Sequence, residues 1–132
     1  MLFRSAGISI SGTDAANYTQ NTSTTTTADI TAKALAVTIT ASNKTYDRTT
    51  TASVTYADDR IAGDVLTVSG TPSFADKNAG TGKTVTATGI TITGADAANY
   101  TQNTSATTTA NITAKALAIG IVADNKIGRA HV

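Results

Sequence analysis

The sequence predicts a mainly β protein, made of small two-layer, sandwich-like β domains repeated in tandem. Threonine supplies 29 of the 132 residues, glutamate is absent, and Thr, Val and Ile suit a pleated, half-buried sheet. In addition, Gly7–Leu35 aligns without gaps with Gly89–Leu117, and most of the aligned positions are identical. The offset from Gly7 to Gly89, which we call the repeat spacing, is of domain size, and self-similarity at such a fixed period is typical of a tandem array.

The repeat spacing divides the chain into five segments. Residues 6–34 are the C-terminal part of a preceding unit, 35–116 a complete unit, and 117–126 the first strand of a following unit. The ends, MLFRS at 1–5 and IGRAHV at 127–132, do not match the repeat and resemble translated sequencing adapter. We therefore leave both ends out of the prediction of the fold, as adapter-derived residues; the alternative is a genuine start and a genuine short tail.

The first partial unit lacks the strands that should open it. Its apolar positions, such as Ile8 and Ile30, therefore have no complete partner sheet. We expect Ala6–Lys33 either to be mobile or to pair with the orphan strand Leu117–Ala123.

Composition excludes several function classes. Between Ala6 and Lys126, eight Lys and Arg stand against nine Asp, a net charge of −1 that offers no basic face to nucleic acid or anionic lipid. There is no cysteine, and the one histidine, His131, lies in the unmatched tail, so a catalytic triad lacks its base. No stretch approaches the roughly 18 apolar residues of a membrane helix. We expect no catalysis, no cofactor and no membrane insertion in this segment.

The complete unit reads as five or six short strands. Apolar residues alternate with Thr and Ser in Leu35–Ala41, in Ala52–Tyr56 and in Leu66–Ser69. The third strand is expected to break at Gly70 and Pro72 and to lie at an edge or a bend, because proline cannot donate to a ladder. The expected core is Leu35, Val37, Ile39, Tyr46, Val54, Tyr56, Leu66, Val68, Phe74, Val85, Ile90, Ile92, Tyr100 and Ile112.

The second half of the unit begins with its longest extended run, Lys83–Thr93. The alternation changes phase at Gly89, which predicts a β-bulge or a strand break there. The segment GADAANY that follows allows no more than a helical turn near Asp96–Tyr100, which Asp96 is placed to cap. Tyr100 is then expected to return to the core. The inward positions of the last strand and of the restarted first strand are Ala110, Ile112, Ala114, Leu117, Ile119 and Ile121.

Two stretches of the unit are distinctive, namely FADKNAGTGK at Phe74–Lys83 and GADAANY at Gly94–Tyr100. With them, Leu35–Ala116 resembles the YDG-type repeat domain of very large exported bacterial adhesins of the filamentous-haemagglutinin kind. The family's Tyr-Asp-Gly reads Tyr46-Asp47-Arg48 here, so a positive φ at Arg48 would cost on the order of 1 kcal/mol unless the turn type has changed. The residues that match the family motifs are Tyr46, Asp47, Phe74, Asp76, Lys77, Asn78, Gly80, Gly82, Gly94, Asp96, Asn99 and Tyr100.

The resemblance implies a non-catalytic stalk or spacer repeat that is secreted or displayed on a bacterial surface. Its partners would be neighbouring repeats of the same chain, with host surface molecules reached through other domains. The alternative is a repeat that itself binds a host glycan or surface ligand. Calcium is a further alternative, because carboxylates are the ligands that calcium prefers, although no EF-hand pattern is present. The candidate ligands are the loop residues Asp58, Asp59, Asp64 and Asp76.

Overall fold

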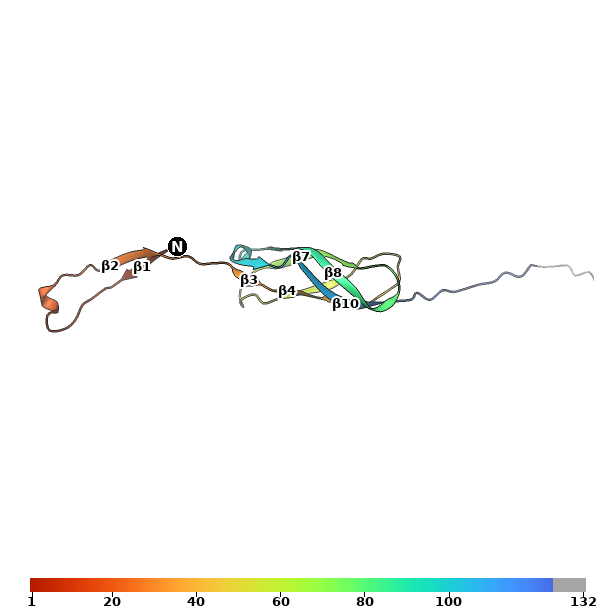
Figure 1. Ribbon diagram of the computed structural model, residues 1–132, viewed down its shortest axis with the longest axis horizontal. Coiled ribbons are helices and arrows are strands. Elements are labelled where there is room, and N and C mark those ends of the chain that lie inside the picture. The colour runs from red at the N-terminus through yellow and green to blue at the C-terminus, as the bar shows by residue number, and fades with distance from the viewer. Residues whose placement is uncertain (125–132) are drawn as a thin grey trace, which may run out of the picture.

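The computed structural model describes residues 1–124 as an N-terminal hairpin, a central β domain and an extended C-terminal segment (Figure 1). The expected segment 127–132 and the end of the third unit, residues 125 and 126, lie outside the described residues. The strands are β1 (Leu2–Ala6), β2 (Ser23–Thr27), β3 (Lys33–Leu35), β4 (Val37–Ala41), β5 (Lys44–Thr45), β6 (Val54–Asp58), β7 (Thr67–Phe74), β8 (Gly80–Thr93), β9 (Tyr100–Gln102) and β10 (Ser105–Thr113). Two 3-10 turns, η1 (Ala15–Asn17) and η2 (Ala97–Asn99), are the helical elements of residues 1–124. In that range no helix has the length and apolar character to cross a membrane.

The central domain is built mainly from β-strands in two layers, as expected. The main sheet has the order β5-β10-β8-β7, and the antiparallel pair β4–β6 packs over it. The core between them consists of Leu35, Val37, Ile39, Ala52, Leu66, Phe74, Val85, Ala87, Ile90, Tyr100, Ala110 and Ile112. Five residues expected in the core are only partly buried and pack against it: Tyr46, Val54, Tyr56, Val68 and Ile92. Three of these core residues are alanines, namely Ala52, Ala87 and Ala110.

Strand β7 lies at an edge of the main sheet, as its proline predicts. The expected break is wrong, however, because β7 runs without interruption through Gly70 and Pro72. The N–H of Phe74 donates outward to the carbonyl of Thr50 (2.8 Å), so Pro72, two residues earlier, faces the same outer edge and removes no bond to β8. The predicted bulge at Gly89 is confirmed: Gly89 (φ +60°) and Ile90 together stand opposite Gly70.

The N-terminal hairpin repeats the β8–β10 hairpin residue for residue. The pairs from Leu2–Thr27 to Ala6–Ser23 have the register of the pairs from Thr84–Thr109 to Thr88–Ser105, displaced by the repeat spacing. Residues 2–5 form part of a strand although their sequence does not match the repeat. The physical reason is that ladder hydrogen bonds use backbone groups, so β1 needs no particular side chains to pair with β2.

The third unit's first strand does not form. Leu117–Ala123 is extended and exposed, and it does not pair with the N-terminal hairpin, from which the central domain separates it (Figure 1). Ala114, expected to face inward, is exposed beyond the end of β10. In the complete unit the corresponding residues are held by β9 and β6, and residues 117–124 have no such strands beside them.

Arg48 lies in the left-handed region with φ +71°, the one non-glycine residue of 1–124 to do so. We expect Arg48→Gly to raise the free energy of unfolding by up to about 1 kcal/mol, because the left-handed strain of roughly 1–2 kcal/mol is relieved and the greater chain entropy of glycine offsets only part of it. Urea unfolding measures the difference. Lys77→Gly is the control: Lys77 lies in an exposed loop and has no positive φ, so glycine relieves no strain there and should lower the free energy of unfolding. A loss of stability in Arg48→Gly would contradict the assignment of strain.

Candidate functional site

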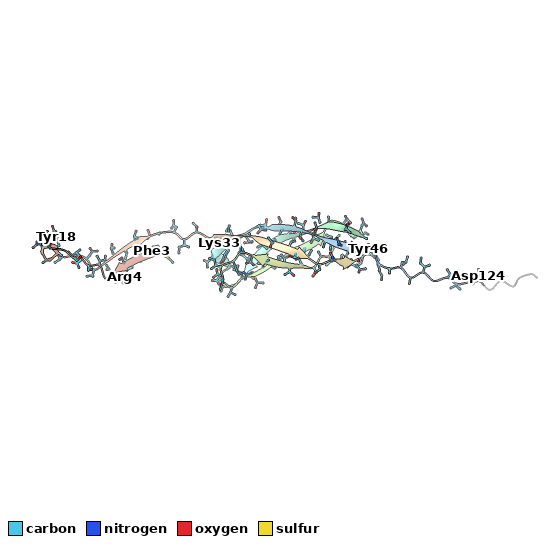
Figure 2. The ribbon with its side chains drawn as sticks, turned by 90° about the horizontal axis from the view of Figure 1, so that it is seen from below. Phe3, Arg4, Tyr18, Lys33, Tyr46 and Asp124 are labelled. Atoms are coloured by element: carbon cyan, nitrogen blue, oxygen red, sulfur yellow. The ribbon has the colours of Figure 1, made fainter. Side chains whose placement is uncertain are left out.

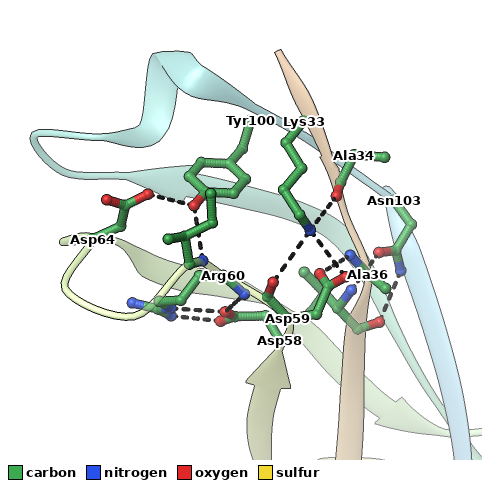
Figure 3. Close-up of polar contacts among 11 residues, drawn as sticks. Lys33, Ala34, Ala36, Asp58, Asp59, Arg60, Asp64, Tyr100 and Asn103 are labelled. Atoms are coloured by element: carbon green, nitrogen blue, oxygen red, sulfur yellow. Dashed lines mark hydrogen bonds and ion pairs between the residues drawn. The ribbon is translucent and has the colours of Figure 1, made fainter.

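Polar side chains gather at the end of the central domain where the chain enters from the hairpin (Figure 3). Asp59 and Asn103 bind the entering segment Lys33–Val37, and Lys33 of that segment binds Asp59; we call Lys33, Asp59 and Asn103 the N-terminal clasp. They come from β3, from the loop after β6 and from the turn between β9 and β10. The clasp therefore joins three segments that are far apart in sequence.

Asp59 holds the entering chain with both carboxylate oxygens. Its Oδ1 accepts a hydrogen bond from the N–H of Ala36 (2.8 Å), and its Oδ2 accepts one from Nζ of Lys33 (3.1 Å). The same ammonium donates to the carbonyl of Ala34 (3.2 Å). The Ala36 N–H, followed by Lys33, lowers the pKa of Asp59. Ala36 stands between β3 and β4, outside either ladder, and the carboxylate supplies the partner that its N–H needs.

The side-chain amide of Asn103 supplies the two hydrogen bonds that a neighbouring strand would give to the backbone of Val37. Its Oδ1 accepts from the N–H of Val37 (2.7 Å), and its Nδ2 donates to the carbonyl of the same residue (3.0 Å). A third bond, from Nδ2 to the carbonyl of Ser105 (2.7 Å), fixes the orientation of the side chain. Because Val37 is only 3% exposed, water has little access to its backbone groups, and they depend on this amide.

Asp58 and Arg60 form a bidentate ion pair beside the clasp. Nε and Nη2 of the guanidinium lie 2.7 and 2.5 Å from the two carboxylate oxygens, and Nη1 donates to the carbonyl of Leu66 (2.7 Å). The Asp58 side chain is only 5% exposed, and the Arg60 hydrogen bond lowers its pKa. The hydroxyl of Tyr100 donates to Asp64, a bond that raises the pKa of the phenol. Both contacts hold the loop that follows β6.

The GADAANY motif also contacts the loop that follows β6, at Val65. Gly94 has φ +123°, and a Cβ there would lie 2.7 Å from the carbonyl oxygen of Val65. Asp96 then exchanges two bonds with Val65: its Oδ2 accepts from the N–H (2.7 Å), and its own N–H donates to the carbonyl (3.2 Å). The expected capping role of Asp96 is wrong, because η2 has no side-chain cap and the carboxylate is used by the loop instead.

The second motif, FADKNAGTGK, closes the turn between β7 and β8. Asp76 accepts from the N–H of Asn78 (2.8 Å) and from Nζ of Lys83, and these bonds, the lysine first, lower its pKa. Gly82 has φ +59°, and its N–H donates to Oδ1 of Asn111 on β10 (2.8 Å). These motif residues therefore shape a hairpin turn, as the Asx-type contact of Asp76 is known to do. Gly80 opens β8, while Lys77 and Asn99 are exposed.

Lys44 organises the turn around Tyr46 and Asp47, and its ammonium lies 5.3 Å from the centroid of the Phe74 ring. Its Nζ donates to Oδ1 of Asp47 (2.9 Å) and to the carbonyl of Thr49 (2.8 Å). The Lys44 contact is the main reason that the pKa of Asp47 falls to about 2. The lysine thus neutralises the carboxylate and satisfies loop carbonyls together.

Lys44 and Asn103 are not among the site residues predicted from the sequence. Both recur at the repeat spacing, as Lys126 and Asn21. For Asn103, that recurrence marks every identical residue of the duplicated segment equally and so could not separate it from its neighbours. Lys44 lies beyond this segment, where fewer positions recur, and its recurrence alone does not indicate a contact.

The four aspartates considered as calcium ligands are engaged by separate partners. Asp58 pairs with Arg60, Asp59 with Lys33, Asp64 with Tyr100, and Asp76 with Lys83. Within residues 1–124, no three carboxylate or histidine side chains are placed to share a metal ion. The same carboxylates instead fix loops and the entering strand.

We expect acid to destabilise the domain. The folded protein lowers the pKa of four carboxyl groups below the ordinary 3.8, so each group stabilises the fold above its unfolded pKa and loses this contribution as pH falls through its folded pKa. The Tm should hold between about pH 7 and 5 and fall from about pH 4 towards 2. Thermal unfolding by circular dichroism measures the profile, and Asp47→Asn should make it shallower. A Tm that rises on acidification would contradict the shifts. The four groups are Asp47, Asp58, Asp59 and Asp76.

Comparison with known proteins gives one finding. A family model for the YDG domain matches residues 31–110, a range that holds the N-terminal clasp and every motif residue described above. No curated protein and no solved structure matches the chain. The match supports the expected domain, while the expected adhesin context stays a prediction.

Proposed function

Because the chain belongs to the YDG domain family, we propose that the unit is a structural spacer repeat of a large bacterial adhesin that is secreted or displayed on the cell surface. Its direct partners in this role are the neighbouring repeats of the same chain, and other domains of the adhesin contact host molecules. The repeat performs no catalysis. Its task is to separate its two neighbours and to carry tension between them.

The observation that supports this role most strongly is where the chain enters and leaves the domain. Strand β3 begins at one end of the elongated domain, and the chain leaves β10 at the other end (Figure 1). Units connected in this way lie end to end, and each adds its full length to the array.

The joint between consecutive units is short. Ile30 and Thr31 correspond, at the repeat spacing, to Ile112 and Thr113, the last residues of β10. In an intact preceding unit, both would belong to its sheet, and Ala32 alone would separate that sheet from β3 of the next unit. A joint of one residue has few rotatable bonds, which favours an extended array over a flexible one.

The first and last strands of the domain run in the same direction. Strand β3 pairs in parallel with β9, and β5 pairs in parallel with β10. Tension on the two ends therefore pulls the opening strands one way and β10 the other, along their lengths. The ladder hydrogen bonds are loaded together, whereas an antiparallel pair pulled from one end opens one bond at a time. This geometry suits a repeat that carries tension.

Single-molecule unfolding tests the proposal directly. The chain has no cysteine, so two introduced cysteines define where the force acts. We expect a higher unfolding force between Ala32→Cys and Ala114→Cys, which load the parallel strands in shear, than between Thr67→Cys and Thr93→Cys. The latter two are directly paired and exposed at one end of β7–β8, so that pull opens the hairpin progressively. A force between the domain ends that is equal or lower would contradict the spacer role.

A further inference from the structure

We propose that the two ends of the complete unit are complementary contact surfaces, through which each unit packs against its neighbour in the array. We call the end where β3 begins the entry end, and the end where the chain leaves β10 the exit end (Figure 1). The partner of an entry end is the exit end of the preceding unit. This contact rests on the spacer role proposed above, because it needs consecutive units of the same chain.

The charged side chains of residues 33–114 gather at the two ends, with opposite net charge. The entry end has two cations against four aspartates, a net charge of −2: Lys33, Asp58, Asp59, Arg60, Asp64 and Asp96. The exit end has four cations against two aspartates, a net charge of +2: Lys44, Asp47, Arg48, Asp76, Lys77 and Lys83. Figure 2 shows Lys33 at one end of the domain and Tyr46, next to Asp47 in sequence, at the other. The basic exit end of one unit therefore suits the acidic entry end of the next.

Two charges at each end are left unbalanced by the ion pairs inside the unit. At the exit end both aspartates are paired with lysines, and Arg48 and Lys77 remain, exposed and without an ion pair to any of residues 1–124. At the entry end both cations are paired with aspartates, and Asp64 and Asp96 remain. The hydrogen-bond donors of these two carboxylates are a hydroxyl and a backbone N–H, which do not neutralise them (Figure 3). Two free cations thus match two uncompensated carboxylates on the facing unit.

The entry end also carries uncovered apolar side chains. Ile61 and Val65 lie on either side of Asp64 in the loop that follows β6, and they are 58 and 60% exposed. In residues 33–114 they are the two large hydrophobic side chains with such exposure. Long cationic side chains pack their aliphatic stems on apolar surface while the charged group stays in water, so Arg48 and Lys77 of the preceding unit suit this loop in both respects.

The short joint brings the facing ends within range of each other. Thr113 ends β10, and Lys115, the counterpart of Lys33, opens the next unit, so Ala114 alone separates the two. Two residue steps span at most about 7 Å, which is comparable with the Debye length of about 8 Å at physiological salt. Exposed ion pairs are individually weak, but the joint holds the two ends at a high effective concentration, so a weak contact is sufficient to align consecutive units.

The distance between two consecutive units tests the proposal. The chain used is the full chain with residues 33–114 present twice in succession, and Thr55→Cys in each unit carries a nitroxide spin label. Thr55 is an exposed, uncharged position on β6, away from both ends. We expect double electron–electron resonance to give a narrow distance distribution at low salt. The distribution should broaden at about 1 M salt, where the Debye length falls to about 3 Å.

Placing the same substitutions in either unit separates the contact from effects on folding. Arg48→Glu with Lys77→Glu in the first unit puts like charges on the facing ends and should at least double the width of the distribution. In the second unit the same pair is the matched control, because the exit end there faces no further unit, and the width should stay unchanged.

Three outcomes overturn the proposal: equal effects from the two placements, no effect from either, or a broad distribution in the unaltered two-unit chain. The spacer role is tested separately by the unfolding force of a single unit between Ala32→Cys and Ala114→Cys, which does not depend on a contact between units.

Discussion

Replacing Gly94 by alanine is expected to lower the free energy of unfolding by at least about 3 kcal/mol, which is a large share of the stability of a small domain. The backbone at Gly94, with φ +123°, is strained for any residue that carries a Cβ, at about 1–3 kcal/mol. The added Cβ would also lie 2.7 Å from the carbonyl oxygen of Val65. The two backbone segments that contain Gly94 and Val65 must then separate. This separation weakens both hydrogen bonds between Asp96 and Val65, at a cost in stability of about 1 kcal/mol each.

Gly82→Ala isolates the strain from the collision. Gly82 also has a positive φ, of +59°, but nothing lies within 4 Å of a Cβ built there. Its substitution should cost about 1 kcal/mol, from strain alone. Urea unfolding of both variants measures the difference. Equal losses for Gly82→Ala and Gly94→Ala would mean that the approach of Val65 is not what requires a glycine at position 94.

Alternation along the chain predicted most of the large apolar residues that face the core of the complete unit. Leu35, Val37 and Ile39 alternate with threonine and alanine in sequence, and all three are buried. The same pattern could not show which strands pair. Strand β3 pairs with β9, which lies more than half of the unit further along the chain, and nothing in the period-two pattern of either strand specifies the other. Pairing is decided by how the whole core closes.

The two terminal segments show that the pattern measures suitability for a sheet rather than the presence of one. Leu117–Ile121 has the alternation of β3 and β4, yet it forms no strand because no partner strand is in place. Leu2–Ser5 does not match the repeat, yet it forms most of β1 because β2 offers its backbone groups. The strand state follows from the neighbour in both cases.

The polar contacts were the least predictable part of the site. Asp96 precedes a short helical turn and fits a capping position, but Val65 approaches it in the folded chain and its N–H takes the carboxylate. Asn103 lies 66 residues from Val37, and no local pattern relates them. The positive φ of Arg48 was one of the two alternatives that the family's Tyr-Asp-Gly turn implied, because it belongs to a local turn, whereas the clasp depends on tertiary contacts.

We expect Asn103→Ala to lower the free energy of unfolding by about 2–4 kcal/mol, because it leaves both the N–H and the carbonyl of Val37 unpaired at a position that is 3% exposed. Asn21→Ala is the matched control, since among residues 1–124 the side chain of Asn21, the counterpart of Asn103 in the N-terminal hairpin, bonds only to the carbonyl of Ser23. It should leave the Tm of the central domain unchanged. Equal Tm values for Asn103→Ala and the unaltered chain would mean that the Val37 backbone finds another partner.

The same substitution separates general stability from resistance to tension. Asn103 joins the opening strand, through Val37, to the start of β10, so a pull between Ala32→Cys and Ala114→Cys loads its hydrogen bonds directly. A pull between Thr67→Cys and Thr93→Cys opens β7 from β8, in which Asn103 has no part. In Asn103→Ala, the unfolding force should therefore fall more along the first axis than along the second. An equal fall along both would make Asn103 a contributor to stability alone, and the resistance to end-to-end tension would then rest on the β3–β9 and β5–β10 ladders.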